Sequence, residues 1–281
     1  MKASENQIQD QQRDTWDRFA AGWRAWDATV SRWLAPVGQA MIADAALGDR
    51  SVVLDVATGT GEPGLSAAAM LPQGRVTLTD LAERMLAVAS DNAAQRGIRN
   101  VETRVCAADA LPFGDGSFDA GLCRFGFMFF PDVPTAAREL VRVTRPGGRV
   151  STAVWAAPQK NPWATIIMGT IARHVPAATA SPSAPGLFRC AGDGYLREVL
   201  AAAGLKDIVV HEVPCPMTHD SPQRYWEFMT DVAAPVVAGL SMADKPTRDL
   251  IHDEVLDLAR RYVRDGRVEI HAAATVATGT K

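Results

Sequence analysis

The chain has few cysteines, no long hydrophobic run and no excess of basic residues. Its four cysteines, among 281 residues, are scattered and include no C-x-x-C pair, so neither a zinc site nor a disulfide framework is predicted. No apolar run approaches the roughly 20 residues that cross a bilayer, and the polar N-terminal residues do not resemble a signal peptide. The formal net charge of −3 does not favour nucleic-acid binding. These absences predict a reduced, cytoplasmic protein without a metal, a nucleic-acid partner or a membrane anchor.

What the chain does have is a series of short apolar segments that alternate with helical ones. Strands are predicted at residues 52–57, 75–80, 101–107, 118–127, 149–156, 206–214 and 268–279. Strands that alternate with helices at this spacing indicate βαβ units and a parallel sheet covered on both faces. The predicted fold is therefore α/β, with a doubly wound, Rossmann-like, seven-stranded and mostly parallel sheet.

The pattern also predicts three regions. They are an N-terminal helical cap (1–47), a core (48–215 plus 267–281) with a variable cap segment inside it (157–190), and a helical lid (216–266). The lid is expected to be an insertion between two neighbouring strands, because residues 218–265 look helical and the sheet continues after them. Inside the variable segment, a loop rich in proline, alanine and serine is predicted at residues 176–185.

Tryptophan is concentrated in the cap, which contains four of the seven: Trp16, Trp23, Trp26 and Trp33. Trp16, Phe19, Ala20 and Trp23 follow helical spacing and therefore share one face of a predicted helix. Such a stripe docks a helix onto a protein core. A second hypothesis, compatible with the first, is that one or two of the indole rings also close over a ligand.

The strongest motif, Asp-Val-Ala-Thr-Gly-Thr-Gly at residues 55–61, stands at the end of the first predicted strand. Its glycines allow a ligand to approach the backbone, and the amides at the start of the next helix favour a polar or anionic group. Residues 59–64 also match the dinucleotide pattern G-x-G-x-x-G. Asp80 ends the second strand, where an acidic side chain can accept hydrogen bonds from both hydroxyls of a ribose. Asp109 follows the third strand.

Together these segments resemble the class I S-adenosylmethionine (SAM)-dependent methyltransferases, most closely the menaquinone/ubiquinone-biosynthesis-type (methyltransferase type 11-like) group that acts on small molecules. The segment LDVATGTGEPG resembles the first motif of that group, LTDLAERML the second and AADALPFGDGSFDAGLCRFGFMFF the third and fourth. ELVRVTRPGGRV, with a predicted tight turn at residues 145–149, resembles the fifth. The resemblance covers about residues 52–150. It implies SAM as cofactor, S-adenosylhomocysteine (SAH) as product and a small-molecule acceptor.

The resemblance also implies a role for individual residues. Ala57, Gly59 and Gly61 would line the methionine moiety, Asp80 would bind the ribose, Leu81 would pack on the adenine, Asp109 and Ala110 would touch the adenine edge, and Arg124 would face the amino-acid portion or the substrate. Trp23, from the aromatic stripe, is a further candidate for the cofactor site. The family often has glycine where Ala57 stands, and a methyl group there narrows the loop.

No catalytic base is predicted. The candidates outside the cofactor motifs are His174, Tyr195, His219 and Tyr225, and a structural role is favoured for each of them. A base is needed only when the acceptor is still protonated in its bound state. The lid is rich in alanine, proline and aromatic residues and has few fixed charges, which favours a partly apolar small molecule as the acceptor.

Three other functions stay open from the sequence. The G-x-G-x-x-G match would suit an NAD(P)-dependent oxidoreductase, although no tyrosine is followed four residues later by lysine, as in short-chain dehydrogenases. A nucleic-acid methyltransferase that acts on exocyclic base amines would carry an (Asn/Asp)-Pro-Pro-aromatic motif, and the chain has no Pro-Pro pair. The third alternative is a SAM-binding module without activity.

Overall fold

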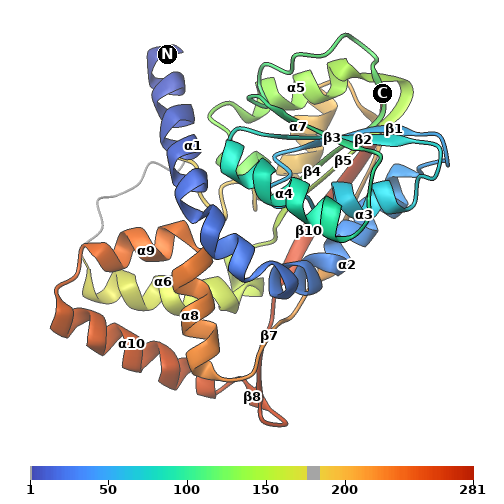
Figure 1. Ribbon diagram of the computed structural model, residues 1–281. Helices are drawn as coiled ribbons and strands as arrows, with labels where there is room; N and C mark the ends of the chain where they lie inside the picture. The colour runs from blue at the N-terminus through green and yellow to red at the C-terminus, as the bar shows by residue number, and fades with distance from the viewer. Residues whose placement is uncertain (1, 176–183) are drawn as a thin grey trace.

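A seven-stranded sheet forms the centre of the computed structural model, which describes residues 2–175 and 184–281 (Figure 1). The strand order is β3-β2-β1-β4-β5-β10-β6, and β10 runs antiparallel to both of its neighbours. The strands are β1 (Val52–Val56), β2 (Arg75–Asp80), β3 (Val101–Val105), β4 (Phe118–Arg124), β5 (Thr144–Trp155), β6 (Lys206–Pro214) and β10 (Ala273–Thr280). The predicted α/β, Rossmann-like, mostly parallel sheet is confirmed.

Helices cover both faces of the sheet. On one face lie α2 (Asp27–Ala45), α3 (Gly64–Ala69) and α4 (Glu83–Gln95), and on the other α5 (Val133–Val143) and α7 (Tyr195–Ala202). The central strands are buried along most of their length because helices cover both faces in this way. The start of α5 is fixed by Asp132, whose side chain accepts a hydrogen bond from the backbone amide of Thr135 at 3.0 Å.

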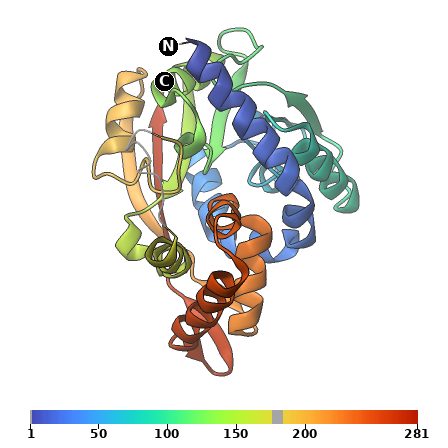
Figure 2. The ribbon, with the colours of Figure 1, turned by 90° about the vertical axis from the view of Figure 1, so that its left-hand side faces the viewer.

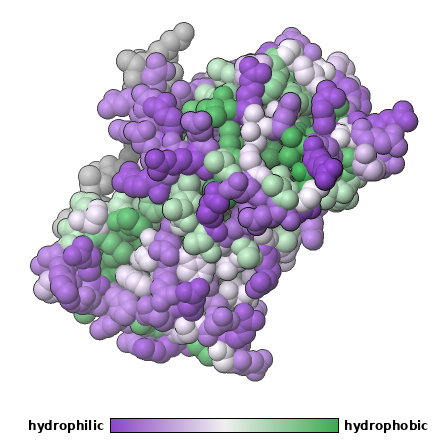
Figure 3. All heavy atoms as spheres, viewed as in Figure 1, coloured by the Kyte–Doolittle hydropathy of each residue, from purple (hydrophilic) through white to green (hydrophobic). Residues whose placement is uncertain are grey.

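A second group of elements lies beside the sheet, at the lower left of Figure 1. It consists of α6 (Pro162–His174), α8 (Pro222–Val232), α9 (Ala234–Ser241), α10 (Lys245–Arg260) and a small sheet of β7 (Met217–His219), β9 (Arg267–Ile270) and β8 (Val263–Arg264). One continuous hydrophobic cluster joins this group to the main core. Apolar residues gather on its visible surface over α9 (Figure 3). Among the described residues, no helix is long and apolar enough to cross a membrane.

Helix α1 (Lys2–Ala25) connects the two parts and runs diagonally across the molecule in Figure 2. It packs against α4 on the sheet side and against α8 on the other. The carboxylate of Asp17 accepts a hydrogen bond from the backbone amide of Arg84, at the start of α4, at 2.9 Å. Just after α1, the indole of Trp26 donates to the side chain of Asp231 in α8 at 2.8 Å. Helix α1 is therefore anchored on both sides.

The predicted last strand over residues 268–279 is wrong in one respect, because the structure divides it into β9 and β10, which belong to different sheets. β9 pairs with β8 in a hairpin instead of continuing into the large sheet. This hairpin begins inside residues 218–265, which were predicted to be helical. Asp265 and Gly266 have φ angles of 47° and 79° and connect β8 to β9. Two central residues with positive φ are typical of type I′ hairpins, in which Asp-Gly is a preferred pair.

The predicted turn at residues 145–149 is also placed differently. These residues belong to the start of β5, where the pairing with β4 shifts register between Phe118 and Ala120. The backbone amide of Gly147 donates to the carbonyl of the C-terminal residue, Lys281, at 2.8 Å. The segment is an irregular strand start rather than a free turn. Most of the loop predicted at residues 176–185 lies outside the described residues.

Candidate functional site

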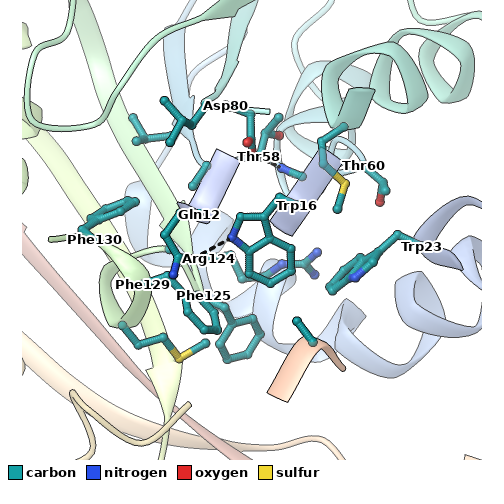
Figure 4. A pocket seen from close by; sticks show the side chains of 18 of the residues that line it. Gln12, Trp16, Trp23, Thr58, Thr60, Asp80, Arg124, Phe125, Phe129 and Phe130 are labelled. Carbon is teal, nitrogen blue, oxygen red and sulfur yellow. Dashed lines mark hydrogen bonds between the residues drawn. The ribbon is translucent and has the colours of Figure 1, made fainter. Parts of the chain in front are cut away.

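A cavity lies at the carboxyl ends of β1, β2 and β4, and α1 and the α8–α9 connection close it from the opposite side (Figure 4). In open α/β sheets, ligands bind at this edge, where the strand order reverses direction. Here the reversal falls between β1 and β4. The cavity is therefore at the position that the fold favours for a ligand. Its lining includes Ala57, directly after β1, and Asp80 and Arg124, the last residues of β2 and β4.

The loop after β1 forms the floor of the cavity. Gly59 has a φ angle of 58°, and a Cβ atom added there would meet nothing within 4 Å. This glycine leaves an open cradle that a ligand can enter. Gly61 differs, because its added Cβ would lie 2.5 Å from the side chain of Leu65 in α3, so it serves helix packing. Ala57 adopts a φ angle of 55° and lines the cavity, a conformation that costs about 1–2 kcal/mol for a residue with a side chain.

Asp80 ends β2 and is held by two backbone amides. Gly59 donates to its Oδ2 and Ala82 to its Oδ1, each at 2.9 Å. The side chain is 9% exposed and faces the cavity. Burial raises the pKa of this carboxyl above its usual value, while the amide hydrogen bonds act in the opposite direction. Each oxygen keeps a lone pair beyond its amide bond, so the carboxylate can accept further hydrogen bonds from a ligand with neighbouring hydroxyls.

Asp109 faces the cavity from the segment after β3 and already binds an amide group. The Nε2 of Gln9 in α1 donates to both carboxylate oxygens of Asp109, at 2.9 and 2.7 Å. The carboxylate of Asp109 therefore accepts hydrogen bonds from an NH₂ group at the edge of the cavity.

Arg124 ends β4 and points into the same cavity (Figure 4). Its Nη1 donates to the backbone carbonyl of Leu34 at 3.3 Å, and no ion pair joins it to a carboxylate of the described residues. Burial lowers the pKa of the guanidinium, while the carboxylates of Glu62, Asp55 and Asp27 raise it. A partly buried cation without an ion-pair partner among the described residues attracts an anionic group of a ligand.

Aromatic side chains from α1 cover the cavity. Trp16 packs edge-to-face against Trp23, with ring centroids 6.1 Å apart, and against Phe129 at 5.1 Å (Figure 4). The indole of Trp23 donates to the backbone carbonyl of Val232 at 3.2 Å. The stripe predicted from the sequence therefore lies on α1, which contacts both α4 and α8.

Most of the predicted cofactor residues come together in this cavity. Its lining includes Ala57, Gly59, Asp80, Leu81, Asp109, Arg124 and Trp23, whereas Gly61 and Ala110 lie outside it. Gln9 and Gln12 also line the cavity, although neither was predicted as a site residue. A signal was present, since Gln12 lies four residues before Trp16 and so extends the predicted helical stripe backwards. The contact of Gln9 with a residue 100 positions away had no such signal.

The four candidates for a catalytic base lie outside the cavity lining: His174, Tyr195, His219 and Tyr225. His174 contacts Glu254 at 2.7 Å, between α6 and α10. The hydroxyl of Tyr225 donates to the carbonyl of Trp163 at 2.6 Å in the core. His219 is buried among aromatic rings, and burial lowers the pKa of its imidazole to about 4.

Asp55 lies beneath the loop and is fully buried. Its Oδ2 accepts hydrogen bonds from the hydroxyl of Thr58 at 2.6 Å and from the amide of Gly64 at 2.9 Å. Within the described part of the chain, its Oδ1 has no hydrogen-bond partner. Burial raises the pKa of this carboxyl to about 7. Asp55 braces the loop from below and does not itself reach the cavity.

The chain is similar to known proteins along much of its length. Residues 53–148 match the family described as "Methyltransferase domain". Over 246 residues, the chain is 31% identical to the uncharacterized protein Rv1405c of Mycobacterium tuberculosis, and the match covers 84% of each protein. Over 126 residues, it is 40% identical to the demethylmenaquinone methyltransferase of Thermus thermophilus. That match covers 44% of this chain and 56% of the Thermus protein.

Among solved structures, a putative methyltransferase from Bacillus halodurans is similar with a TM-score of 0.55 and 21% sequence identity. The match covers 87% of this chain and 98% of that one. At this identity, the similarity shows a shared fold and nothing more about the site.

The buried carboxyl of Asp55 predicts a pH dependence of stability. The folded chain binds its proton below about pH 7, and the unfolded chain only below about pH 4. Between these values, the folded state holds the extra proton, so this group raises the unfolding free energy as the pH falls, by about 1.4 kcal/mol per pH unit. Asp55→Asn should remove the effect, whose total is about 4 kcal/mol. Urea unfolding across this pH range measures it.

The exposed variant Asp249→Asn is the control for a general effect of losing one carboxylate. The account is contradicted if the difference in unfolding free energy between the wild type and Asp55→Asn stays constant with pH.

Proposed function

Because the chain belongs to the class I SAM-dependent methyltransferases, we propose that it transfers the methyl group of SAM to a small, partly apolar metabolite and releases SAH. The observation that carries this proposal is one continuous cavity with a polar end, at Asp80 and Asp109, and an apolar end lined by aromatic rings. SAM supplies a methyl group on a positively charged sulfur. The polar end suits the adenosyl part of SAM, and the apolar end remains for the acceptor.

We assign the cofactor contacts as follows. Asp80 accepts hydrogen bonds from the two ribose hydroxyls, because its oxygens face the cavity while two amides fix its orientation. Asp109 accepts the adenine amine in place of Gln9, and Leu81 packs on the adenine ring. Gly59 and Ala57 border the methionine part, and Arg124 binds its carboxylate. We assign no contact to the exposed Ala110 or to Gly61, which packs against α3.

The residues of the chain act by binding, orienting and excluding water. Holding the acceptor close to the methyl group can lower the barrier by about 7–11 kcal/mol through proximity and orientation. Within the described residues, no histidine, tyrosine or lysine lines the cavity. Cys106 does line it, but burial raises the pKa of its thiol to about 11, which keeps it protonated and unreactive near neutral pH. We therefore assign no catalytic base.

Two observations weigh against the alternative functions. The order found in NAD(P)-dependent dinucleotide-binding sheets is 3-2-1-4-5-6 with parallel strands, whereas here the antiparallel β10 stands between β5 and β6. A nucleic-acid methyltransferase must admit a polymer to its acceptor site. Helix α1 lies across this cavity, and Arg124 is its one basic lining residue among those described.

We also propose that α1 closes over the bound cofactor. Trp16 and Trp23 line the cavity and contact each other and Phe129 across it. The helix is held at its flanks by hydrogen bonds to α4 and to the end of α8. A covered cavity keeps water from the cofactor and slows its release.

The ribose assignment predicts that Asp80→Ala weakens SAH binding at least about 100-fold, because it removes two hydrogen bonds to a charged group and each contributes about 1.5–3 kcal/mol. Titration calorimetry measures the affinity. Asp249→Ala, an exposed carboxylate in α10, is the matched control and should bind SAH as the wild type does. Equal affinities for wild type and Asp80→Ala would rule out the ribose contact.

The closing role of α1 predicts that Trp16→Ala raises the dissociation rate of SAH about tenfold, since the variant removes a ring that covers the cavity. Stopped-flow displacement measures this rate. Trp226→Ala is the control, because Trp226 packs against His252 outside the cavity lining. If both variants release SAH at the rate of the wild type, Trp16 has a packing role only.

A further inference from the structure

Two residues that line the cavity have backbone conformations that side chains disfavour. Ala57, directly after β1, has a φ angle of 55°, and Phe125, directly after β4, has one of 61°. Among the described residues, the other non-glycine residues with positive φ are Ala46, Asp207 and Asp265, and none of them lines the cavity. A glycine adopts this conformation without strain. Because costly backbone conformations concentrate at binding sites, the two side chains at the cavity call for a functional reason.

Backbone hydrogen bonds to neighbouring strands hold both residues in place. The amide of Thr58 donates to the carbonyl of Thr79 in β2 at 2.9 Å, and the amide of Phe125 donates to the carbonyl of Ala153 in β5 at 2.8 Å. Each loop therefore continues the pairing of the strand that it follows. The position of the Ala57 methyl group is consequently determined by the sheet.

The pairing of the strands places Ala57 in the middle of the proposed cofactor site. The sheet pairs β1 with β2 on one side and with β4 on the other. When both registers are continued past the paired residues, Ala57 stands level with Asp80 at the end of β2 and with Arg124 at the end of β4. Neighbouring strands are about 4.8 Å apart, so Ala57 lies halfway between two backbones that are about 10 Å apart.

This halfway position corresponds to the sulfur of the cofactor. In the assignment above, Asp80 binds the ribose and Arg124 binds the carboxylate of the methionine part. The sulfur of SAM stands between these two groups in the covalent structure of the molecule. Residue 57 is therefore the residue that lies next to the sulfur and to the alkyl group that it carries.

The methyl group of Ala57 fills the space between the loops after β1 and β4. A Cβ atom added to Gly126 would lie 2.9 Å from the Cβ of Ala57, so this methyl group faces the loop after β4. The same added atom would lie 2.7 Å from the sulfur of Cys123 and 2.8 Å from the ring of Phe130. Position 126 thus has no room for a side chain while the methyl group of Ala57 is present.

The neighbouring wall of the cavity has little freedom to move aside. The ring of Phe125 stacks on that of Trp155 with centroids 4.2 Å apart, and Trp155 is itself buried. A packed wall of this kind yields only at a cost when a ligand is too large. One extra methylene group in a closely fitted site changes binding by about 10- to 200-fold.

We propose that the methyl group of Ala57 limits the size of the alkyl group that the donor can carry on its sulfur; this rests on the function proposed above. A methyl group fits between Ala57 and Phe125, whereas a longer alkyl group meets one of them. Ala57 is then a specificity-determining residue that takes no part in making or breaking bonds. The strain at residue 57 has a reason in this proposal, since a glycine would relieve it but would widen the site.

The test compares two donors that differ by one methylene group: SAM, and S-adenosylethionine, which carries an ethyl group in place of the methyl. Titration calorimetry on the full chain, without an acceptor, gives both dissociation constants, and their ratio is the measured quantity. For the wild type, the ethyl donor should bind at least about tenfold more weakly than SAM. Ala57→Gly should lower this ratio at least about threefold, because it removes the methyl group while glycine adopts the left-handed conformation freely.

Ala46→Gly is the matched control. Ala46 has a φ angle of 49° at the C-terminal end of α2 and lies outside the cavity lining, so this variant relieves the same kind of strain at a distance from the site. It should leave the ratio as in the wild type. Because the ratio compares two donors on one protein, a general change in cofactor affinity cancels out.

Three results would overturn the proposal. They are a wild-type ratio below about tenfold, a change of less than about threefold in Ala57→Gly, and an equal change in Ala46→Gly, which would trace the effect to backbone strain alone. If neither SAM nor SAH binds to the wild type, the proposed function fails instead, so the two failures are distinguishable.

Discussion

The site depends on the clamp that two backbone amides form on the carboxylate of Asp80. The amide of Gly59 comes from the loop after β1, and that of Ala82 from the start of the segment after β2. The clamp therefore joins the ends of two neighbouring parallel strands, which pair up to Val56 and Thr79. A buried carboxylate is tolerated only when it is hydrogen-bonded. The same bonds that satisfy Asp80 also fix the loop and turn the remaining lone pairs of the oxygens towards the cavity.

The rest of the cavity extends this arrangement by separating charge from apolar surface. Asp80 and Asp109 line one end of the cavity, which we assign to the adenosyl part of the cofactor. Aromatic rings, among them Trp33 and Trp155, line the other end, which we assign to the acceptor. Helix α1 contributes Gln9 to the polar end of the cavity and Trp16 and Trp23 to its middle. One helix therefore contacts both the carboxylate end of the cavity and its middle.

The sequence predicts best what is encoded locally. The loop at Gly59 and the acid at Asp80 each follow a short apolar strand, and both could be placed because parallel strands end at one edge of the sheet. The hairpin at Asp265 was missed because the helical pattern around it was extended too far, although Asp-Gly is a known turn signal. The bounds of other strands differ from the prediction by a few residues, for example at the ends of β3 and β4, because tertiary packing decides where a strand ends.

The packing of the tryptophan rings and the contact of Gln9 with Asp109 could not be predicted in this way. Trp33 contacts both Trp155 and Trp163, from which it is separated by more than a hundred residues. No periodicity within a single segment carries such information, since these contacts depend on how α2 and α6 pack against the end of β5. The sequence showed that tryptophans were concentrated in the cap, but not which rings would face one another.

The most direct test of the central claim is a crystal structure of the full chain grown with excess SAH. The account predicts that the ribose hydroxyls lie within hydrogen-bond distance of Asp80, that the adenine amine contacts Asp109, and that the sulfur faces the apolar end of the cavity. A cavity without ligand under these conditions, or SAH bound at another place on the chain, would contradict it.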